Sequence, residues 1–232
     1  MLKLDGVHAN YGKSHVLQGV TLEVRDGEAV ALLGRNGVGK TTTLKTIMGL
    51  LPATGGSVVF DGERLDKTPP HRIPRLGLGY VPQGRRIFPN LTVLENLCLG
   101  LPRDPRDGEL DGVFARFPVL EQRALQAGGT LSGGEQQMLA IARCLVMKPK
   151  LILLDEPTEG IMPKLVASIR QDIKAINQEG VSILLVEQNI RTALAVCGRV
   201  YVMEKGVICH QAGSAELRQS PEVVHRFLGV AL

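Results

Sequence analysis

The chain alternates between short apolar runs and helical stretches, which is typical of an α/β protein. Alternating apolar residues predict strands over residues 2–4 and 16–24, because successive side chains of a strand face opposite sides of its sheet. Residues 29–33 are all apolar, which predicts a strand buried on both faces. Further strands are predicted over residues 57–60, 78–81, 151–154, 182–186 and 199–204, and helices over residues 40–50, 163–179 and 190–197.

The middle of the chain has a different pattern. From about residue 83 the apolar residues fall at helical spacing, as at Leu91, Leu94 and Leu97, and this spacing places them on one face of a helix. We therefore expect a mostly helical subdomain, over approximately residues 84–148, inserted in a single domain that spans residues 1–232.

A glycine-rich segment lies between the strand predicted over residues 29–33 and the helix that follows. It matches GxxxxGK[ST], the pattern of a phosphate-binding loop. Backbone N–H groups and the helix start attract phosphates, Lys40 adds a positive charge, and the Thr41 hydroxyl can ligate Mg²⁺. A glycine turn ahead of an ordinary helix is the competing interpretation. Lys40 and Thr41 disfavour it, because they stand at the positions that the motif requires. The predicted nucleotide contacts are Gly34, Arg35, Asn36, Gly37, Val38, Gly39, Lys40, Thr41 and Thr42.

Two carboxylates follow the apolar run at residues 151–154. The carboxyl ends of parallel strands meet at the ligand-binding crevice of an α/β sheet. We therefore expect Asp155 to hold Mg²⁺, directly or through water, and Glu156 to polarise the water that attacks the γ-phosphate. An acidic turn at a strand end is common by itself, but the preceding phosphate loop favours the catalytic interpretation.

A second glycine-rich segment opens a predicted helix near residue 132. Ser132 with Glu135 three residues later forms a capping box. Capping does not explain Gly133 and Gly134, which free backbone N–H groups for an anion at the helix start. One domain has no evident use for two such sites on one nucleotide. We therefore expect Ser132, Gly133, Gly134 and Gln136 to contact, in trans, the ATP bound by a neighbouring chain.

Composition limits the function only mildly. The 232 residues are 44% hydrophobic and 22% charged, which suits one sizeable core. Aromatic residues make up only 3%, with no Trp, so base stacking on nucleic acid has little material and no nucleic-acid partner is expected. The net charge of +4 suits a polyanionic ligand as readily as plain solubility.

The cysteines and the apolar runs bear on the expected cellular location. The four cysteines show no metal-binding or disulfide spacing, which indicates free thiols in a reducing cytosol. No apolar run approaches the ~20 residues that cross a bilayer, and the first residues do not resemble a signal peptide. We expect a cytoplasmic protein that acts at a membrane only through a partner.

The three motifs, in this order, resemble the ATP-binding subunits of ABC transporters over essentially the whole chain. The run at residues 131–135, LSGGE, is among the most specific motifs of that family. The resemblance implies a P-loop NTPase of the ABC ATPase type. That fold is α/β, with a mixed-sheet core, an antiparallel β subdomain and an inserted α-helical subdomain. It also implies ATP and Mg²⁺ as cofactors, held between two ATPase subunits that close head to tail.

The same resemblance assigns roles to three further residues. Tyr11 would stack on adenine with Val16 beneath the ring, although a tyrosine in a simple turn is the alternative. Gln83 would contact Mg²⁺ or the attacking water and relay motion to the helical insertion. That insertion would contact the integral membrane permease subunits.

Two positions depart from the general pattern of the family. Gln188 stands where a histidine normally follows the strand after the acidic pair. Glutamine can donate a hydrogen bond to the γ-phosphate but cannot carry a proton at neutral pH. Met162 replaces the usual aspartate of the turn after Glu156. Both features are typical of the amino-acid uptake subgroup, so we do not interpret them as inactivation.

Finer matches at residues 41–50, 84–89, 131–143 and 185–189 resemble the branched-chain amino-acid uptake ATPases, with urea-uptake ATPases as close relatives. The resemblance implies an ATP-hydrolysing importer subunit, peripheral on the inner face of the cell membrane. Its partners would be permease subunits, a second ATPase subunit (the same or a related chain) and, indirectly, a periplasmic or extracellular solute-binding protein.

Three alternatives remain open at this point. Gln188 allows a weakly hydrolysing, ATP-gated clamp. A soluble ABC protein that acts on DNA or ribosomes usually carries tandem cassettes or a long coiled coil, and this chain shows neither. A small P-loop kinase would leave residues 131–137 unexplained.

Overall fold

The computed structural model describes residues 1–101, 103–220 and 222, which form two β-sheets and a set of helices. The antiparallel sheet has the order β2 (Ser14–Val24), β1 (Leu2–Tyr11), β4 (Ala53–Phe60), β5 (Glu63–Arg64). The mixed sheet has the order β10 (Val207–Gly213), β9 (Arg199–Glu204), β3 (Ala29–Leu33), β8 (Ser182–Glu187), β7 (Leu151–Asp155), β6 (Leu78–Val81).

The α-helices are α1 (Lys40–Ile47), α2 (Val93–Cys98), α3 (Asp111–Arg116), α4 (Pro118–Gln122), α5 (Gly133–Leu145), α6 (Pro163–Gln178), α7 (Ile190–Val196) and α8 (Ser214–Arg218). Short 3₁₀ segments cover Leu65–Lys67, Pro70–Leu76 and Gly128–Thr130.

The mixed sheet is buried on both faces. Strands β6, β7, β8, β3 and β9 run parallel, and β10 pairs antiparallel with β9. In β3, Ala31 and Leu33 face a core shared with α5, α6 and α7, whereas Val30 and Leu32 face a core shared with α1 and the antiparallel sheet. The wholly apolar composition of this strand follows from these two cores.

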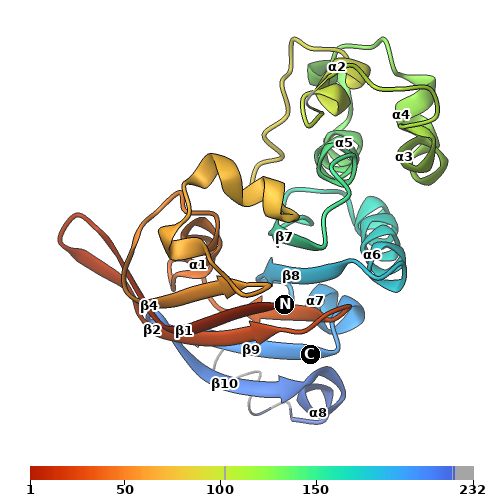
Figure 1. The fold of residues 1–232 in the computed structure, drawn as a ribbon. Coiled ribbons are helices and arrows are strands. Elements are labelled where there is room, and N and C mark those ends of the chain that lie inside the picture. Colours follow the sequence, from red (N-terminus) through yellow and green to blue (C-terminus); the bar gives the residue numbers. More distant parts are fainter. Residues whose placement is uncertain (102, 221, 223–232) are drawn as a thin grey trace.

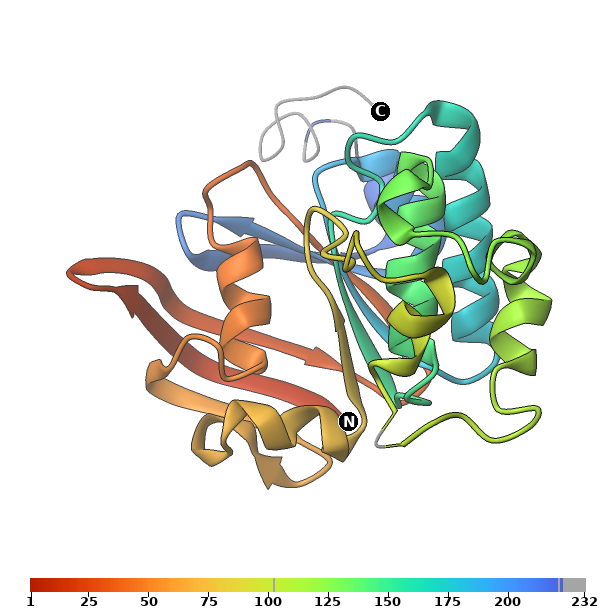
Figure 2. The ribbon, with the colours of Figure 1, turned by 90° about the horizontal axis from the view of Figure 1, so that it is seen from above.

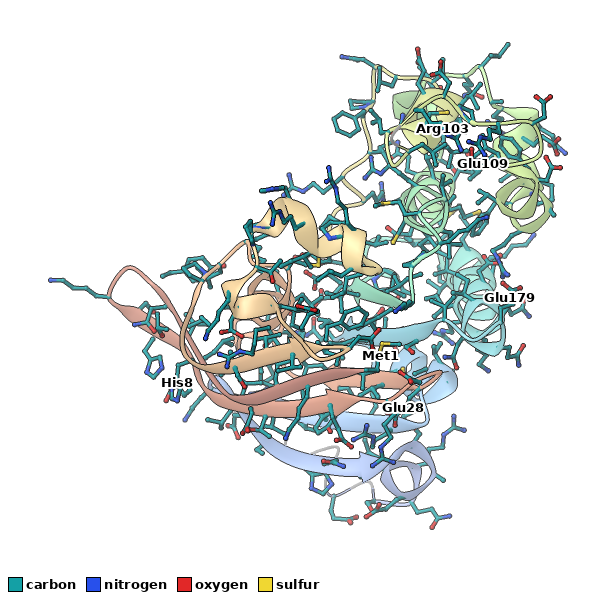
Figure 3. All side chains as sticks on the ribbon, viewed as in Figure 1. Met1, His8, Glu28, Arg103, Glu109 and Glu179 are labelled. Carbon is teal, nitrogen blue, oxygen red and sulfur yellow. The ribbon has the colours of Figure 1, made fainter. Side chains whose placement is uncertain are left out.

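The helices lie on two sides of the mixed sheet. Figure 2 shows α1 beside the antiparallel sheet and α5 and α6 on the opposite side of the molecule. Helices α2–α5 fall between β6 and β7 in the chain, and α2–α4 stand apart from the sheets (Figure 1). Arg103 Nη1 and Glu109 Oε2 lie 3.0 Å apart there and form an ion pair within the segment that connects α2 to α3 (Figure 3).

The predicted fold class is therefore confirmed: an α/β protein with a mixed-sheet core, an antiparallel sheet and inserted helices. The helices α2–α5 all lie within residues 84–148. In the described part of the chain, no helix is both long and apolar enough to cross a membrane.

Several element boundaries differ from the prediction. The first strand continues to Tyr11, well past residue 4, because the bulge beginning after Leu4 interrupts the alternation without ending the strand. The turn of this hairpin lies at Gly12 and Lys13. Helix α1 ends at Ile47 instead of residue 50, because Gly49 takes a left-handed conformation with φ 67°.

Gly79 in β6 shows how closely the inserted helices pack on the sheet. A Cβ atom at this position would overlap the Cys144 Sγ of α5. We expect Gly79→Ala to lower the free energy of unfolding by about 1–3 kcal/mol, since overpacking a core displaces its neighbours. The measurement is urea unfolding, and the double variant with Cys144→Ala should recover part of the loss. Gly112→Ala on α3, where the space is open, serves as the control, and an equal loss there would contradict the account.

Candidate functional site

The phosphate-binding loop leads from β3 into α1. Gly39 stands at the N-cap with φ 116° and no side-chain cap, so it leaves the first N–H groups of α1 without a side-chain acceptor. Arg35, Asn36 and Gly37 are exposed, and Val38 accepts a backbone hydrogen bond from Gly206 at 2.9 Å. The loop therefore offers free donors at a helix start, the arrangement that binds anions.

Lys40 extends back over this loop. Its Nζ donates to the carbonyl oxygens of Gly34 at 2.8 Å and Arg35 at 3.1 Å. The same Nζ lies 3.2 Å from Glu156 Oε1, in an ion pair whose side chains are only 4% and 8% exposed. The lysine predicted to hold phosphate and the glutamate predicted to act on water are thus in direct contact.

Asp155 lies at the carboxyl end of β7 and is 1% exposed. Its carboxylate accepts hydrogen bonds from the Thr41 hydroxyl at 3.1 Å and the Tyr80 hydroxyl at 3.3 Å. Burial raises the pKa of the Asp155 carboxyl, the nearby Glu156 raises it further, and the Thr41 hydrogen bond and Lys40 oppose the change. Ionised Asp155 is therefore under-compensated in this structure.

Glu156 adopts a left-handed backbone conformation with φ 48°. Such a conformation is strained for a residue with a side chain and persists only where the surroundings enforce it. Its N–H donates to the Val186 carbonyl of β8 at 2.9 Å. In this conformation the Glu156 carboxylate lies 3.2 Å from Lys40 Nζ, directly after the end of the strand.

Gln83 follows β6 and reaches the same acidic cluster. Its Nε2 donates to Glu159 Oε2 at 2.7 Å and lies 3.5 Å from Glu156 Oε2. Gln83 also lines a cleft of about 460 Å³ together with Thr41, Tyr80 and Asp155. The structure thus brings Gln83 to the predicted metal ligands, although not into contact with Asp155.

Gln188 is exposed, and it lines a second cleft, of about 480 Å³, together with Glu156. The neighbouring Glu187 is 3% exposed and accepts hydrogen bonds from the Thr158 hydroxyl at 2.7 Å and the Asn189 N–H at 3.2 Å. Burial raises the pKa of the Glu187 carboxyl, and these hydrogen bonds oppose that rise. Glu187 therefore joins the turn after Glu156 to the segment that carries Gln188.

The predicted adenine contacts lie on the β1–β2 hairpin. Tyr11 is 46% exposed, so its ring is free to stack on a base. The pKa of the Tyr80 phenol is raised by burial, then by Asp155 and, to a smaller extent, by Tyr11, which places Tyr11 on the side of the acidic cluster. A Cβ on Gly39 would lie 3.6 Å from the Val16 carbonyl oxygen. Val16 thus borders the phosphate loop.

The second glycine-rich segment forms a separate site at the start of α5. Ser132 Oγ accepts from the Glu135 N–H at 3.4 Å, and Glu135 accepts from the Ser132 N–H at 2.8 Å. The predicted capping box is therefore present. Gly134 has a packing reason that the sequence did not suggest, since a Cβ there would overlap Leu165 Cδ1 of α6. Gln136 Nε2 donates to the Leu131 carbonyl at 3.0 Å.

Ser132, Gly133, Gly134 and Gln136 do not join the cluster around Lys40. In the described part of the chain, none of them forms a hydrogen bond or ion pair with Lys40, Asp155 or Glu156. Met162 is 66% exposed at the N-cap of α6; its side chain makes no cap hydrogen bond, but its carbonyl accepts from the N–H groups of Leu165 at 2.9 Å and Val166 at 3.1 Å.

The donors around Asp155 suit Mg²⁺. Thr41 and Asp155 supply hard oxygen atoms close together, and Gln83 lines the same cleft. Mg²⁺ is usually held by one or two carboxylates together with substrate phosphates, without an all-protein cage. Consistently, no group of three or more His, Cys, Asp or Glu side chains suited to a metal ion occurs within residues 1–101 and 103–220.

Three residues of the site were not predicted from the sequence: Tyr80, Glu159 and Glu187. Tyr80 stands near the carboxyl end of β6, beside β7, and that position was the available signal. The sequence contains no signal for Glu159 or Glu187, because the residues that hydrogen-bond to them, Gln83 and Thr158 respectively, lie in other segments of the chain.

The family model for ABC transporters matches residues 17–159, more than half of the chain. The chain is 45% identical over 233 residues to the high-affinity branched-chain amino acid transport ATP-binding protein BraG of Pseudomonas aeruginosa, covering 99% of this chain and 100% of the relative. It is 34% identical over 240 residues to the branched-chain amino acid transport ATP-binding protein LivF of Archaeoglobus fulgidus, covering 99% of each.

A solved structure shows the same fold. The dimeric post-hydrolysis state of the ATP-binding cassette MJ0796, bound to ADP and Pi, superposes with a TM-score of 0.81 at 28% identity. The match covers 92% of this chain and 99% of that one.

The raised pKa of Asp155 predicts an unusual effect of substitution. A carboxyl whose pKa is higher in the folded state favours folding only at low pH, and that contribution is lost as the pH rises through the folded pKa. At pH 7, above the usual pKa of an aspartate, burial of the Asp155 carboxyl therefore opposes folding. We expect Asp155→Asn to raise the free energy of unfolding at pH 7, with a difference that shrinks toward pH 4, measured by urea unfolding without nucleotide.

Asp66 provides a control of opposite sign. The Arg64 guanidinium hydrogen-bonded to Asp66 lowers the pKa of that carboxyl, so its contribution to stability is present above the unfolded pKa and lost on acidification. Asp66→Asn should thus destabilise the protein at pH 7. Destabilisation by Asp155→Asn at pH 7 would contradict the account, because it would show that burial of the Asp155 carboxyl does not oppose folding.

Proposed function

The chain belongs to the ABC transporter family, and from this premise we propose that it is an ATP-hydrolysing subunit of a membrane importer. The observation that carries the proposal is the gathering of Lys40, Thr41, Asp155 and Glu156 at one edge of the mixed sheet. Positive charge, metal-binding oxygens and a carboxylate base there meet the requirements of phosphoryl transfer to water.

Lys40 and the start of α1 bind the phosphates in this proposal. Removing one partner of a buried ion pair costs about 3–5 kcal/mol, so Lys40 leaves Glu156 only when another anion takes its charge. The β- and γ-phosphates are that anion, and the free N–H groups at Gly39 and after it hold them in place. Tyr11 and Val16 hold adenine.

The loss of the Lys40 contact frees Glu156. Its carboxylate then polarises the attacking water, and Gln83 lies close enough to orient the same water. Thr41, Asp155 and Gln83 are the residues that hold Mg²⁺, which would neutralise charge on the phosphates when bound. Gln188 donates a hydrogen bond to the γ-phosphate but takes no proton.

The start of α5 acts on a second nucleotide. Ser132, Gly133, Gly134 and Gln136 lie outside the cluster that binds the chain's own ATP, at the capped start of the 13-residue helix α5, where Ser132 is exposed. The dimeric state of the similar cassette MJ0796 supports a pair of ATPase subunits, and in our proposal the two subunits close head to tail. In that arrangement each subunit contributes half of both sites.

The similarity to BraG, 45% over nearly the whole length of both chains, supports branched-chain amino acids as the solute. Urea or another small polar solute is the alternative. The second ATPase subunit is another copy or a related chain. Permease subunits that contact the helical insertion would hold the protein on the inner face of the membrane, and a solute-binding protein would deliver the solute.

Gln188 favours a second candidate function, a clamp that binds ATP but turns it over slowly. The side chain is exposed in the cleft beside Glu156, where a proton-carrying histidine would otherwise stand. In this alternative, ATP binding alone closes the dimer.

Replacing the proposed base separates the two functions. Glu156→Gln keeps the shape of the side chain and removes its charge, so we expect turnover to fall by at least about 100-fold while ATP still binds. The measurements are steady-state phosphate release and size-exclusion chromatography with ATP, in which the variant should elute as a dimer.

Glu121→Gln, an exposed change on α4, is the control and should keep wild-type turnover. Unchanged turnover of Glu156→Gln would refute the role given to Glu156. Negligible turnover of the wild type, with an ATP-stabilised dimer, would establish the clamp in place of the ATPase.

A further inference from the structure

Arg85 lies in a strained loop that follows β6. Gly84, Arg85 and Arg86 all have positive φ, at 77°, 65° and 49°. Two consecutive residues with side chains in this region are costly and persist only when their contacts hold them. The Arg86 carbonyl accepts a hydrogen bond from Arg143 of α5 at 2.7 Å, which fixes one end of the loop.

The Arg85 side chain holds the other end, and it joins three segments of the chain. Its Nη1 donates to Gln136 Oε1 on α5 at 3.2 Å, and its Nη2 lies 3.4 Å from the Gly160 carbonyl, in the turn after β7. The guanidinium also covers Gly133, where a Cβ would lie 2.8 Å from Nη2. Gly133 therefore leaves the space that Arg85 occupies.

The same loop holds the turn after β7 at two neighbouring points. Gln83 donates to Glu159 at 2.7 Å, and Arg85 reaches the carbonyl of the next residue, Gly160. Gln83 and Glu159 belong to the cluster around the chain's own ATP, whereas Gln136 belongs to the surface proposed to face the partner's ATP. Arg85 is the side chain that connects the two.

The guanidinium of Arg85 is held only weakly by its neighbours. Among the described residues, no carboxylate forms an ion pair with Arg85, so the guanidinium is held by two neutral oxygens at 3.2 and 3.4 Å. Hydrogen bonds of this length are weaker than charge-assisted bidentate pairs. A small shift of the turn at residues 159–160 therefore moves or releases Arg85.

We propose that Arg85 is a positioning residue that links the two half-sites of one subunit. When Gln83 turns to the metal and the attacking water, its bond to Glu159 is lost. The turn then shifts, and Arg85 carries this shift to Gln136 and the first turn of α5. Nucleotide in the chain's own site thus sets the geometry offered to the partner's nucleotide. This inference rests on the proposed function of the two half-sites.

Hydrogen–deuterium exchange of the isolated chain tests the link. Slow hydrolysis in the Glu156→Gln background keeps ATP bound. Because this variant is expected to dimerise with ATP, exchange is followed at a concentration where size-exclusion chromatography shows a monomer, in peptides over residues 34–42 and 131–141 before and after MgATP addition. Backbone exchange reports local opening free energy. We expect MgATP to slow exchange in both peptides, by about fivefold or more in the second. Adding Arg85→Ala should abolish the change in residues 131–141 only.

Arg72→Ala is the control. Arg72 is exposed on the 3₁₀ segment before β6, and its side chain makes no hydrogen bond or ion pair with any described residue, so the substitution removes the same charge outside the loop that carries Arg85. Arg72→Ala should leave both responses intact. Arg85→Lys, which keeps the charge but loses the planar fork, should restore the response only in part.

The outcomes separate the inference from the function on which it rests. No slowing at residues 34–42 means that ATP does not bind there, and the proposed function fails. Slowing at 34–42 with an unchanged response at 131–141 in Arg85→Ala leaves the function standing and overturns the link. A response at 131–141 that disappears when the protein is diluted reflects contact between subunits, and it also overturns a link within one subunit.

Discussion

The parallel register of four strands holds the candidate site together. In β3, β6, β7 and β8 the last residues are level, since Leu33 pairs with Glu187, Asp155 with Val186 and Val81 with Leu154. The segments that follow these strands therefore leave the sheet at one edge. They are the phosphate loop, the acidic turn, the segment with Gln83 and the segment with Gln188. Burial on both faces fixes the register, because a slip would expose apolar side chains.

Protein groups balance only part of the charge at this edge of the sheet. Lys40 is paired with Glu156 at 3.2 Å, within a buried environment. Asp155 has two hydroxyl donors and a raised pKa, so a cation would relieve it. In the proposed function, the phosphates of a nucleotide would pair with Lys40 and a metal ion would add positive charge beside Asp155.

Local sequence patterns predicted the parts of the site that are encoded locally. The wholly apolar runs at residues 29–33 and 151–154 predicted buried strands, and the motif from Gly34 to Thr41 predicted the loop between strand and helix, because these features depend on neighbours in the chain. The ion pair of Lys40 with Glu156 and the overlap that excludes a side chain at Gly134 were not predictable. Both arise where segments far apart in the sequence meet.

The predicted function of the double glycine at residues 133–134 is refined by the same reasoning. Gly134 is explained by the approach of Leu165, and Gly133 leaves room for Arg85. Neither observation removes the anion-binding role of the helix start, since its N–H groups depend on the backbone and on the Ser132 cap. The glycines therefore serve packing and connection, beside the nucleotide recognition that we propose for them.

The central claim is that this surface acts on a nucleotide other than the one held by Lys40. The most direct measurement is MgATP affinity and turnover of Ser132→Asp, which keeps an N-cap oxygen but repels phosphate, beside the uncharged Ser132→Asn. The account predicts that Ser132→Asp binds MgATP as tightly as Ser132→Asn and loses turnover. Loss of MgATP affinity in Ser132→Asp, to the level of Lys40→Ala, would place both segments on one nucleotide and contradict it.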